Sequence, residues 1–392
     1  MSHFSKHEYL QTIWARYHKA TRAEKKILLD GFCEICGYHR KHAIRLLREK
    51  ACNKTSHAPK PRGRKRGYDD PLLLRVLKTI WRAANLPCAK RLHAMLPLWL
   101  PFYEFELPKA LEQQVLQLSA ATMDRLLKPL RGKYHKRGLA TTKPGSLLKH
   151  HIPVKTNQWD ETVPGFLEAD TVAHCGNSMA GMFVFTVNAT DLATGWSEQR
   201  AVWGKGEHGV LEAVTSIEQT LPFKVRGFDC DNGSEFLNWH LERYLQKRTQ
   251  PIQFTRSRPY HKNDNAHIEN KNWTHVRQYL GYQRFDNPEI TALLNELYTS
   301  EWRWFMNVFM PSVKLIEKKR VGSKIVKKYD HPQTPLARVL ASKHLKAEQK
   351  RQLKVQCQNL NPFLLQKAIS QKIKRILALA TNPAVSDDKN KA

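Results

Sequence analysis

The chain has 392 residues, of which 41% are hydrophobic, and its 65 Lys and Arg against 35 Asp and Glu give a formal net charge of +30. That length predicts several compact units, and so large a positive charge favours a polyanion partner, above all nucleic acid. No apolar run approaches the roughly 18 residues of a transmembrane span and no signal-peptide pattern opens the chain, so we expect a cytoplasmic protein with no membrane partner.

The N-terminal segment has the pattern of a helix-turn-helix unit. Apolar periodicity predicts helices over 5–19, 22–32 and, after Gly37, 39–50. We therefore expect residues 1–52 to form a DNA-binding domain, whose last helix lies in the major groove. The inward-facing side chains would be Ala43, Ile44 and Leu47, and the DNA-binding ones Arg40, Lys41 and Arg45. A plain basic helical hairpin is the alternative interpretation.

Residues 53–69 form a linker rich in proline and glycine. Within it, Pro-Arg-Gly-Arg-Lys-Arg-Gly (61–67) resembles an AT-hook, an extended segment that enters the narrow minor groove of A·T-rich DNA. Arg62, Arg64 and Arg66 would then bind DNA. A solvated basic linker is an equally good interpretation.

Helical periodicity returns over 70–135, which we expect to be a second helical DNA-binding domain. Its strongest feature is Ser119, which precedes a helix carrying Arg125 and Lys128. A basic stretch broken by prolines marks another linker at 136–158.

Residues 159–310 change character and predict a central α/β core. Alternating apolar positions and turn residues predict strands and helices in the order β-β-β-α-β-α-β-α, hence a mixed five-stranded sheet with helices. The predicted strands are 166–172, 182–187, 196–203, 224–228 and 252–255, and the predicted helices are 206–220, 236–248 and 266–280. Residues 289–310 also have a helical pattern.

The C-terminal part is densely basic. We expect a small β region over 311–341 and a helical tail over 342–392. Apolar positions in the tail are available for packing, and its polar face suits either DNA or another subunit.

Three acidic residues in separate segments suggest a metal site. Asp170 lies in a strand otherwise rich in apolar residues, Asp231 lies where a strand meets an Asn-Gly turn, and Glu269 lies in the first turns of a helix. An acid in a buried strand is costly unless it is paired or bound to metal. Carboxylates are ligands of Mg²⁺ and Mn²⁺, and such groups can hold two ions about 4 Å apart for phosphoryl displacement.

These segments resemble the DDE signature of transposases of the retroviral-integrase type. The stretch 232–268 between the second and third acids has the mid-thirties length of that family, and Arg-Pro-Tyr-His-Lys-Asn-Asp-Asn (258–265) is similar too. The resemblance implies a ribonuclease-H-like catalytic core over 159–310. It makes Asp170, Asp231 and Glu269 the catalytic residues and the ligands of two Mg²⁺ or Mn²⁺ ions per active site.

The resemblance is greatest to transposases of bacterial insertion sequences, since the helix-turn-helix and the stretch 327–335 are also similar to theirs. It implies binding of the terminal repeats as double-stranded DNA, cleavage of the element ends and joining of the 3′-hydroxyls to target DNA. A dimer or tetramer on DNA, associated with the bacterial nucleoid, is implied as well. The alternatives are a metal-dependent nuclease on the same fold and a domesticated DNA-binding regulator.

Further residues near the three acids also have candidate roles. Lys271 and Arg277 would bind DNA phosphates, and Asn265 and His267 would position DNA, although each also suits a solvated or packing position. Asp229 and Glu168 compete with the proposed ligands, because each lies two residues before one and shares its strand face.

Glu235 and a cysteine-histidine set are not expected to take part in the chemistry. We expect Glu235 to be structural. The set Cys33, Cys36, His39 and His42 has zinc-ligand types, but the gap between the two pairs is too short for a finger.

Overall fold

The structure, a computed structural model, describes residues 3–48, 68, 70–131, 161–230, 233, 235–256 and 266–380. Contacts divide the chain into two compact units, Met1–Gly67 and Tyr68–Ala392. The predicted AT-hook residues Arg62, Arg64 and Arg66 lie outside the described residues, as do Asp231 and Asn265. The finer domain boundaries stay predictions.

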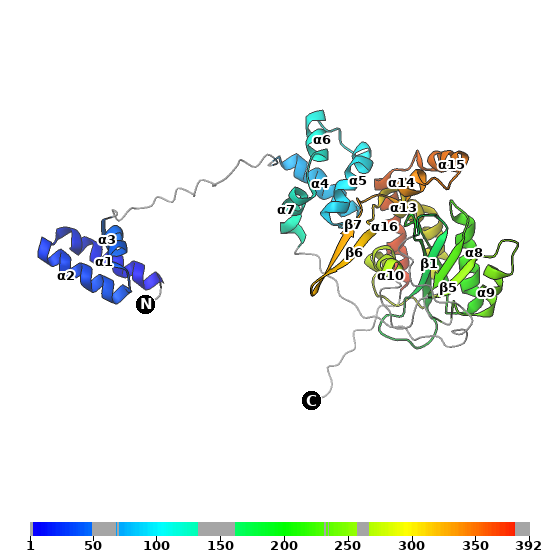
Figure 1. Ribbon diagram of the computed structural model, residues 1–392, viewed down its shortest axis with the longest axis horizontal. Helices are drawn as coiled ribbons and strands as arrows, with labels where there is room; N and C mark the ends of the chain where they lie inside the picture. The colour runs from blue at the N-terminus through cyan, green and yellow to red at the C-terminus, as the bar shows by residue number, and fades with distance from the viewer. Residues whose placement is uncertain are drawn as a thin grey trace. The chain divides into compact units, whose positions relative to one another are not determined.

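The N-terminal unit consists of the helices α1 (His3–Lys19), α2 (Arg22–Cys36) and α3 (Arg40–Arg48), drawn in blue in Figure 1. Gly37 ends α2 with a φ of 63°, a left-handed conformation that glycine adopts without strain. Ala43 and Leu47 are fully buried, as the apolar pattern predicted, whereas Ile44 is only partly buried. The helix, turn and basic helix are therefore present in the predicted order.

The second helical segment comprises α4 (Pro71–Ala83), α5 (Ala89–Trp99), α6 (Lys109–Leu116) and α7 (Ala120–Arg131). It shares one hydrophobic core with helices from the end of the chain. The Trp99 ring meets the edges of Phe305 and Phe363 at centroid distances of 5.9 and 5.1 Å, and its Nε1 donates to the Phe309 carbonyl at 3.2 Å. This segment is thus part of the same compact unit as the sheet.

The sheet has five strands in the order β3-β2-β1-β4-β5. They are β1 (Phe166–Ala173), β2 (Val184–Asp191), β3 (Ser197–Trp203), β4 (Gly227–Cys230) and β5 (Gln253–Arg256). The first three are antiparallel neighbours, and β4 and β5 run parallel to β1. This mixed sheet is the one that the sequence predicted, and it is compatible with a ribonuclease-H-like core.

The two faces of the sheet differ because side chains alternate along each strand. One face is apolar, with Leu167, Ala169 and Phe228 packed in a core with α8 (Glu207–Thr220) and α9 (Trp239–Gln246). The other face carries polar residues, including Glu168 and Asp170. Figure 1 shows α10 (Ala266–Lys271) on the opposite side of the sheet from α8 and α9.

The helix that covers the polar face spans 266–280, as predicted, but it is not uniform. It consists of α10 (Ala266–Lys271), a π-helical segment (Asn272–Arg277) and α11 (Gln278–Leu280). Segments with π geometry are frequent at functional sites. A second such segment (Tyr298–Trp302) joins α12 (Glu289–Leu297) to α13 (Arg303–Phe309).

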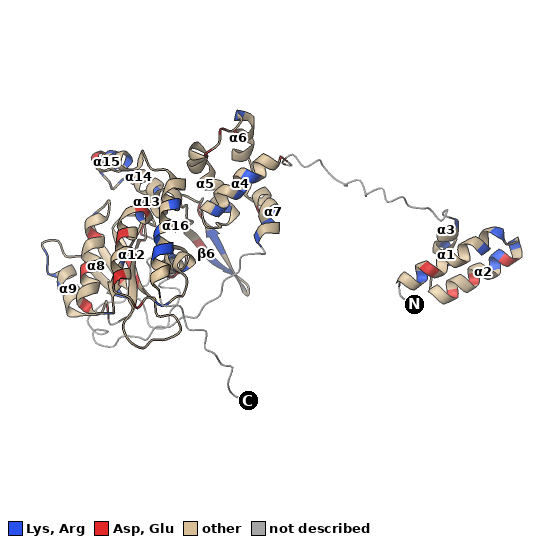
Figure 2. Ribbon diagram, turned by 180° about the vertical axis from the view of Figure 1, so that it is seen from behind, with Lys and Arg blue, Asp and Glu red and all other residues tan. Residues whose placement is uncertain are grey.

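The C-terminal part has the predicted small β region and helical tail. The hairpin of β6 (Leu315–Val321) and β7 (Lys324–Tyr329) is rich in basic residues, as Figure 2 shows. The helices α14 (Pro335–Ala341), α15 (Ala347–Cys357) and α16 (Pro362–Leu379) follow. Ile369, Ile373 and Ile376 of α16 are buried in the shared core, so this helix is a structural element of the Tyr68–Ala392 unit. None of the helices in the described ranges combines the length and apolar character needed to cross a membrane.

Candidate active site

Asp170 lies on the polar face of β1, where it is partly buried. Its Oδ1 accepts a hydrogen bond from the Thr171 backbone N–H at 2.7 Å, and its Oδ2 accepts one from Asn272 Nδ2 at 2.6 Å. Each carboxylate oxygen is therefore held by a donor. The side chain is fixed in direction by the strand beneath it and the helix above it.

A chain of side-chain amides supports Asp170 from the neighbouring strands. Asn188 on β2, the register partner of Asp170, donates from Nδ2 to Asn272 Oδ1 at 2.8 Å. Gln199 on β3 in turn donates from Nε2 to Asn188 Oδ1 at 2.8 Å. We call Gln199, Asn188 and Asn272 the amide relay. Because each amide oxygen accepts from the previous member, the Asn272 amide group is oriented with its N–H toward Asp170.

Glu168, two residues before Asp170, is fully buried, whereas Glu269 in the first turn of α10 is exposed. Burial raises the pKa of Glu168 well above its ordinary value, and the nearby Asp229, Asp170 and Glu269 raise it further. Three acids thus lie close enough to Glu168 to act on its carboxyl group. A backbone donor, the N–H of Ile268 at 3.4 Å from Glu168 Oε1, offsets part of this repulsion.

Asp229 and Glu235 are buried acids with local hydrogen-bond partners. Asp229 Oδ1 accepts from Thr255 Oγ1 at 2.5 Å. Glu235 accepts from Thr171 Oγ1 at 2.8 Å and pairs with Lys205 Nζ at 2.9 Å. The first contact joins β4 to β5, and the second joins β1 to the segment that follows β4.

Asp231 itself lies outside the described residues. The strand before it, β4, ends at Cys230, whose register partner on β1 is Ala169, directly before Asp170. Within the described ranges, which lack Asp231, no group of three or more His, Cys, Asp or Glu is arranged to hold a metal ion. The predicted triad as a whole therefore stays a prediction.

Lys271 and Arg277, expected to bind DNA phosphates, make internal contacts. Lys271 is 8% exposed and donates to the Gly195 carbonyl at 3.1 Å. Burial, together with the nearby charges of Arg91 and Arg338, lowers its pKa to about 7. Arg277 donates to the Ala173 carbonyl at 2.6 Å. The predicted contacts of Lys271 and Arg277 with DNA phosphates stay predictions.

The other predicted DNA-binding residues lie mostly on the N-terminal unit. Lys41 and Arg45 on α3 are exposed, and Arg40 is exposed but forms an ion pair with Asp30. The side chain of His267 lies outside what the structure describes.

Sequence reasoning missed the amide relay. The signal that could have found it is a row of amide residues at matching positions of two adjacent strands, Asn188 and Gln199, but the row becomes visible only once the register is known. Polar groups at consecutive cross-strand positions on a covered face imply a hydrogen-bonded network.

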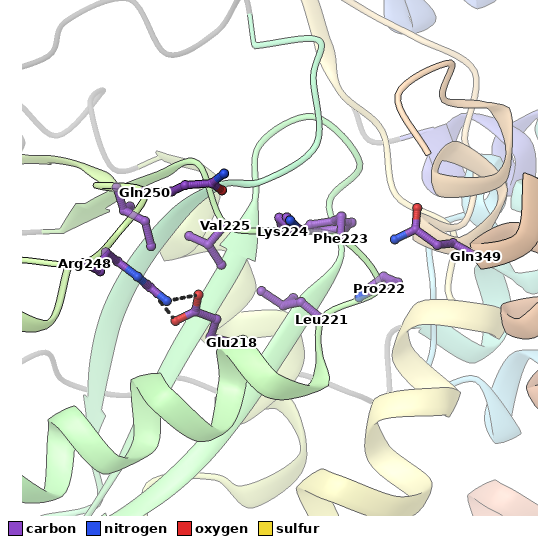
Figure 3. Close-up of a pocket in the computed structure, with 10 residues that line it drawn as sticks. Glu218, Leu221, Pro222, Phe223, Lys224, Val225, Arg248, Gln250 and Gln349 are labelled. Carbon is purple, nitrogen blue, oxygen red and sulfur yellow. Dashed lines mark hydrogen bonds and ion pairs between the residues drawn. The ribbon is translucent and has the colours of Figure 1, made fainter. Parts of the chain in front are cut away.

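A cavity of about 420 Å³ lies elsewhere, beside the end of α8. Figure 3 shows its principal charged groups, Glu218 and Arg248, directed at each other, and the two form an ion pair at 2.9 Å. With these charges mutually satisfied, this cavity is not the candidate site.

Comparisons with known proteins give one clear relative. No family model matches the chain. An uncharacterized protein of Sinorhizobium fredii (strain NBRC 101917 / NGR234), y4rM, is 39% identical over 341 residues, which cover 84% of this chain and 94% of that protein.

Two solved structures show weaker likeness. The catalytic core domain of BIV integrase is 18% identical at a TM-score of 0.28, covering 46% of this chain and 95% of that chain. A simian T-cell lymphotropic virus intasome in complex with PP2A regulatory subunit B56 gamma is 11% identical at a TM-score of 0.29, covering 56% and 68%. At TM-scores this low, neither likeness carries an argument.

Proposed function

We propose that this chain, which belongs to the same family as the Sinorhizobium fredii protein y4rM, is a DNA transposase that cleaves and joins DNA with divalent metal. The observation that carries the proposal is the acidic cluster on the polar face of the sheet. Asp170 and Glu269 both act on the buried Glu168, and the last residue of β4, Cys230, is the register partner of Ala169, directly before Asp170. Asp231 follows Cys230 in the sequence. Such a concentration of carboxylates is costly without cations nearby.

The donor set fits Mg²⁺ or Mn²⁺, because it consists of carboxylate oxygens, the hard ligands that these ions take. Asp170, Asp231 and Glu269 would hold the metal. When bound, two such ions lower the pKa of the attacking hydroxyl or water and neutralise charge on the leaving oxygen.

Residues of the chain orient the carboxylate of Asp170 and bring DNA to the protein. The amide relay keeps the Asp170 carboxylate in one orientation, so that little reorganisation is needed when a ligand binds. The exposed basic side chains Lys41 and Arg45 of α3 supply contacts to DNA, and the net charge of +30 draws DNA to the protein. The DNA would include element ends and target, bound by a dimer or tetramer.

A strand-transfer assay tests the proposal. The full chain would meet labelled duplexes from the DNA that flanks its gene, together with a supercoiled plasmid. We expect joined products with Mg²⁺ or Mn²⁺ and none with a chelator. Metal-dependent cutting without joining would indicate a nuclease instead. Specific binding with no cutting or joining under either metal would contradict the proposed enzyme and favour a DNA-binding regulator.

The amide relay leads to a separate prediction for metal binding. We expect Asn272→Ala to weaken Mg²⁺ or Mn²⁺ binding by about 10- to 100-fold, because a lost outer hydrogen bond leaves the Asp170 carboxylate unoriented. Calorimetric titration of the DNA-free protein with Mn²⁺ measures this directly. Asn270→Ala, at an exposed position of the same helix, is the matched control. Equal Mn²⁺ affinity in both variants would remove the positioning role of Asn272.

A further inference from the structure

A second cavity, of about 450 Å³, lies within the Tyr68–Ala392 unit and has a strongly basic lining. It is bounded by α5, the turn between β2 and β3, the helix 266–280 and the β6–β7 hairpin. We call it the basic pocket, and its charged lining residues are Arg91, Lys271, Lys314, Lys327 and Asp191. Four cationic side chains thus face one carboxylate.

The single acid does not neutralise these cations. Asp191 Oδ1 accepts from the Gly165 backbone N–H at 2.7 Å, and Oδ2 accepts from Thr194 N and Oγ1 at 2.8 and 2.6 Å. Its hydrogen-bonding capacity is therefore largely used by the turn that it stabilises. Among the described residues, none of the four cations forms an ion pair with an acid.

Three of the four cations are held by backbone carbonyl groups. Arg91 Nε donates to Pro311 at 2.6 Å, Lys271 Nζ to Gly195 at 3.1 Å and Lys314 Nζ to Ala193 at 2.9 Å. One such bond leaves further N–H donors on each group. These carbonyl contacts fix the positions of the cations before any ligand arrives, which reduces the entropy lost on binding.

A buried histidine adds a polar atom to the same lining. His275 is 4% exposed, and its Nδ1 makes a hydrogen bond with Thr274 Oγ1 at 2.9 Å. Its Nε2 is buried and has no hydrogen-bond partner in the part of the chain that the structure describes. Such orphaned buried groups are rare in folded proteins and often mark the place of a missing ligand or water.

We propose that the basic pocket binds a phosphate group. Buried like charges destabilise a fold unless a counter-charge offsets them, and a compact anion with several acceptor oxygens suits ammonium and guanidinium donors. The pocket differs from the acidic site in the sign of its charge. The two share one helix, since Asn272 reaches Asp170 while its neighbour Lys271 lines the pocket.

Two ligands could supply the phosphate group: free inorganic phosphate and the DNA backbone. Only the DNA backbone rests on the proposed function. Lys327 and Tyr329 on β7 are exposed at the pocket. They lie two residues apart on one face of the strand, whereas Lys328 is on the other face. This alternation provides a matched pair of lysines for the test.

The test follows the thermal stability of the full chain, with a chelator present, during titration with inorganic phosphate against chloride at equal ionic strength. We expect a saturable rise of the melting temperature with phosphate alone. Lys327→Gln should weaken the apparent phosphate affinity by about tenfold, because one charge-assisted hydrogen bond is lost. Lys328→Gln should leave the affinity unchanged.

Lys271→Met provides the second variant. It should fold at least as well as the wild-type protein without phosphate, because it replaces a buried amino group by an apolar one, and it should lose most of the stabilisation by phosphate. Equal responses to phosphate and chloride, or an unchanged phosphate affinity in both Lys327→Gln and Lys271→Met, would overturn the proposal.

A short metal-free duplex distinguishes the two sources. If the DNA backbone is the ligand, the duplex should suppress the response to free phosphate, and Lys327→Gln should weaken duplex binding more than Lys328→Gln does. If the free ion is the ligand, the phosphate response should persist beside the duplex. This binding assay contains no metal. Its result can therefore be interpreted even if the strand-transfer assay shows no activity.

Discussion

Asp170→Ala, Asp231→Ala and Glu269→Gln should each reduce the rate of metal-dependent DNA cleavage and joining by at least about 100- to 1000-fold. This range is the loss typical of removing one group that stabilises charge in a transition state. DNA binding without metal should be unchanged, since the basic side chains of α3 remain. Single-turnover strand transfer measures the rate, and gel shift measures binding.

The exposed position of Glu269 makes its variant the cleanest of the three. The matched control for Glu269→Gln is Glu289→Gln, because Glu289 is also an exposed acid in the first turn of a helix. Both substitutions remove the same charge near a helix N-terminus, so their effects on stability should be alike. If both variants joined DNA as fast as the wild-type protein, Glu269 would not be a metal ligand.

The competing acids require their own comparison. If Asp170→Ala kept its activity while Glu168→Gln lost it without loss of folding, the ligand on β1 would be Glu168. Glu168 is fully buried and has an oxygen without a hydrogen-bond partner among the described residues, which makes it the strongest competitor. Circular dichroism of both variants would separate unfolding from a lost ligand.

Trp99→Ala should destabilise the Tyr68–Ala392 unit by about 3–5 kcal/mol, the usual cost of removing a large aromatic side chain from a core. Trp99 is fully buried, packs on Phe305 and Phe363, and donates a hydrogen bond to the Phe309 carbonyl. The truncation therefore leaves both a cavity and an unpaired carbonyl. Denaturant unfolding followed by circular dichroism measures the loss.

Phe105→Ala is the control for Trp99→Ala, because Phe105 lies in the same helical segment but is 61% exposed. Its effect should stay within about 0.5 kcal/mol. A comparably small effect of Trp99→Ala would mean that α4–α7 are not energetically coupled to the sheet-bearing part of the unit. That outcome would favour the separate helical domain over 70–135 that the sequence predicted.

Local patterns were enough to predict the architecture. The strand and helix order of the central core follows from periods of 2 and 3.6 residues, and both are properties of short segments. The Asn-Gly turn, the apolar surroundings of Asp170 and the first-turn position of Glu269 are likewise readable along the chain. The order of the strands within the sheet comes from the structure.

The buried position of Lys271 could not be predicted from local patterns. A basic residue two positions after Glu269 suggested a phosphate contact at the DNA surface, but the side chain is buried against the β2–β3 turn. The face on which a helical residue lies depends on how the helix packs, and in this chain a π-helical segment begins at the next residue. Neither the packing of the helix nor the start of the π-helical segment can be recognised from the neighbouring residues in the sequence.

The sequence by itself determined the charge, the order of elements, the helix-turn-helix pattern and three candidate acids, because each depends on residue types and their spacing. Only the tertiary structure brought Asn188, Gln199 and Asn272 together beneath Asp170 and gathered Arg91, Lys271, Lys314 and Lys327 around one pocket. Those residues come from strands and helices far apart in the chain. Their contacts depend on sheet register and helix packing, which the whole fold decides.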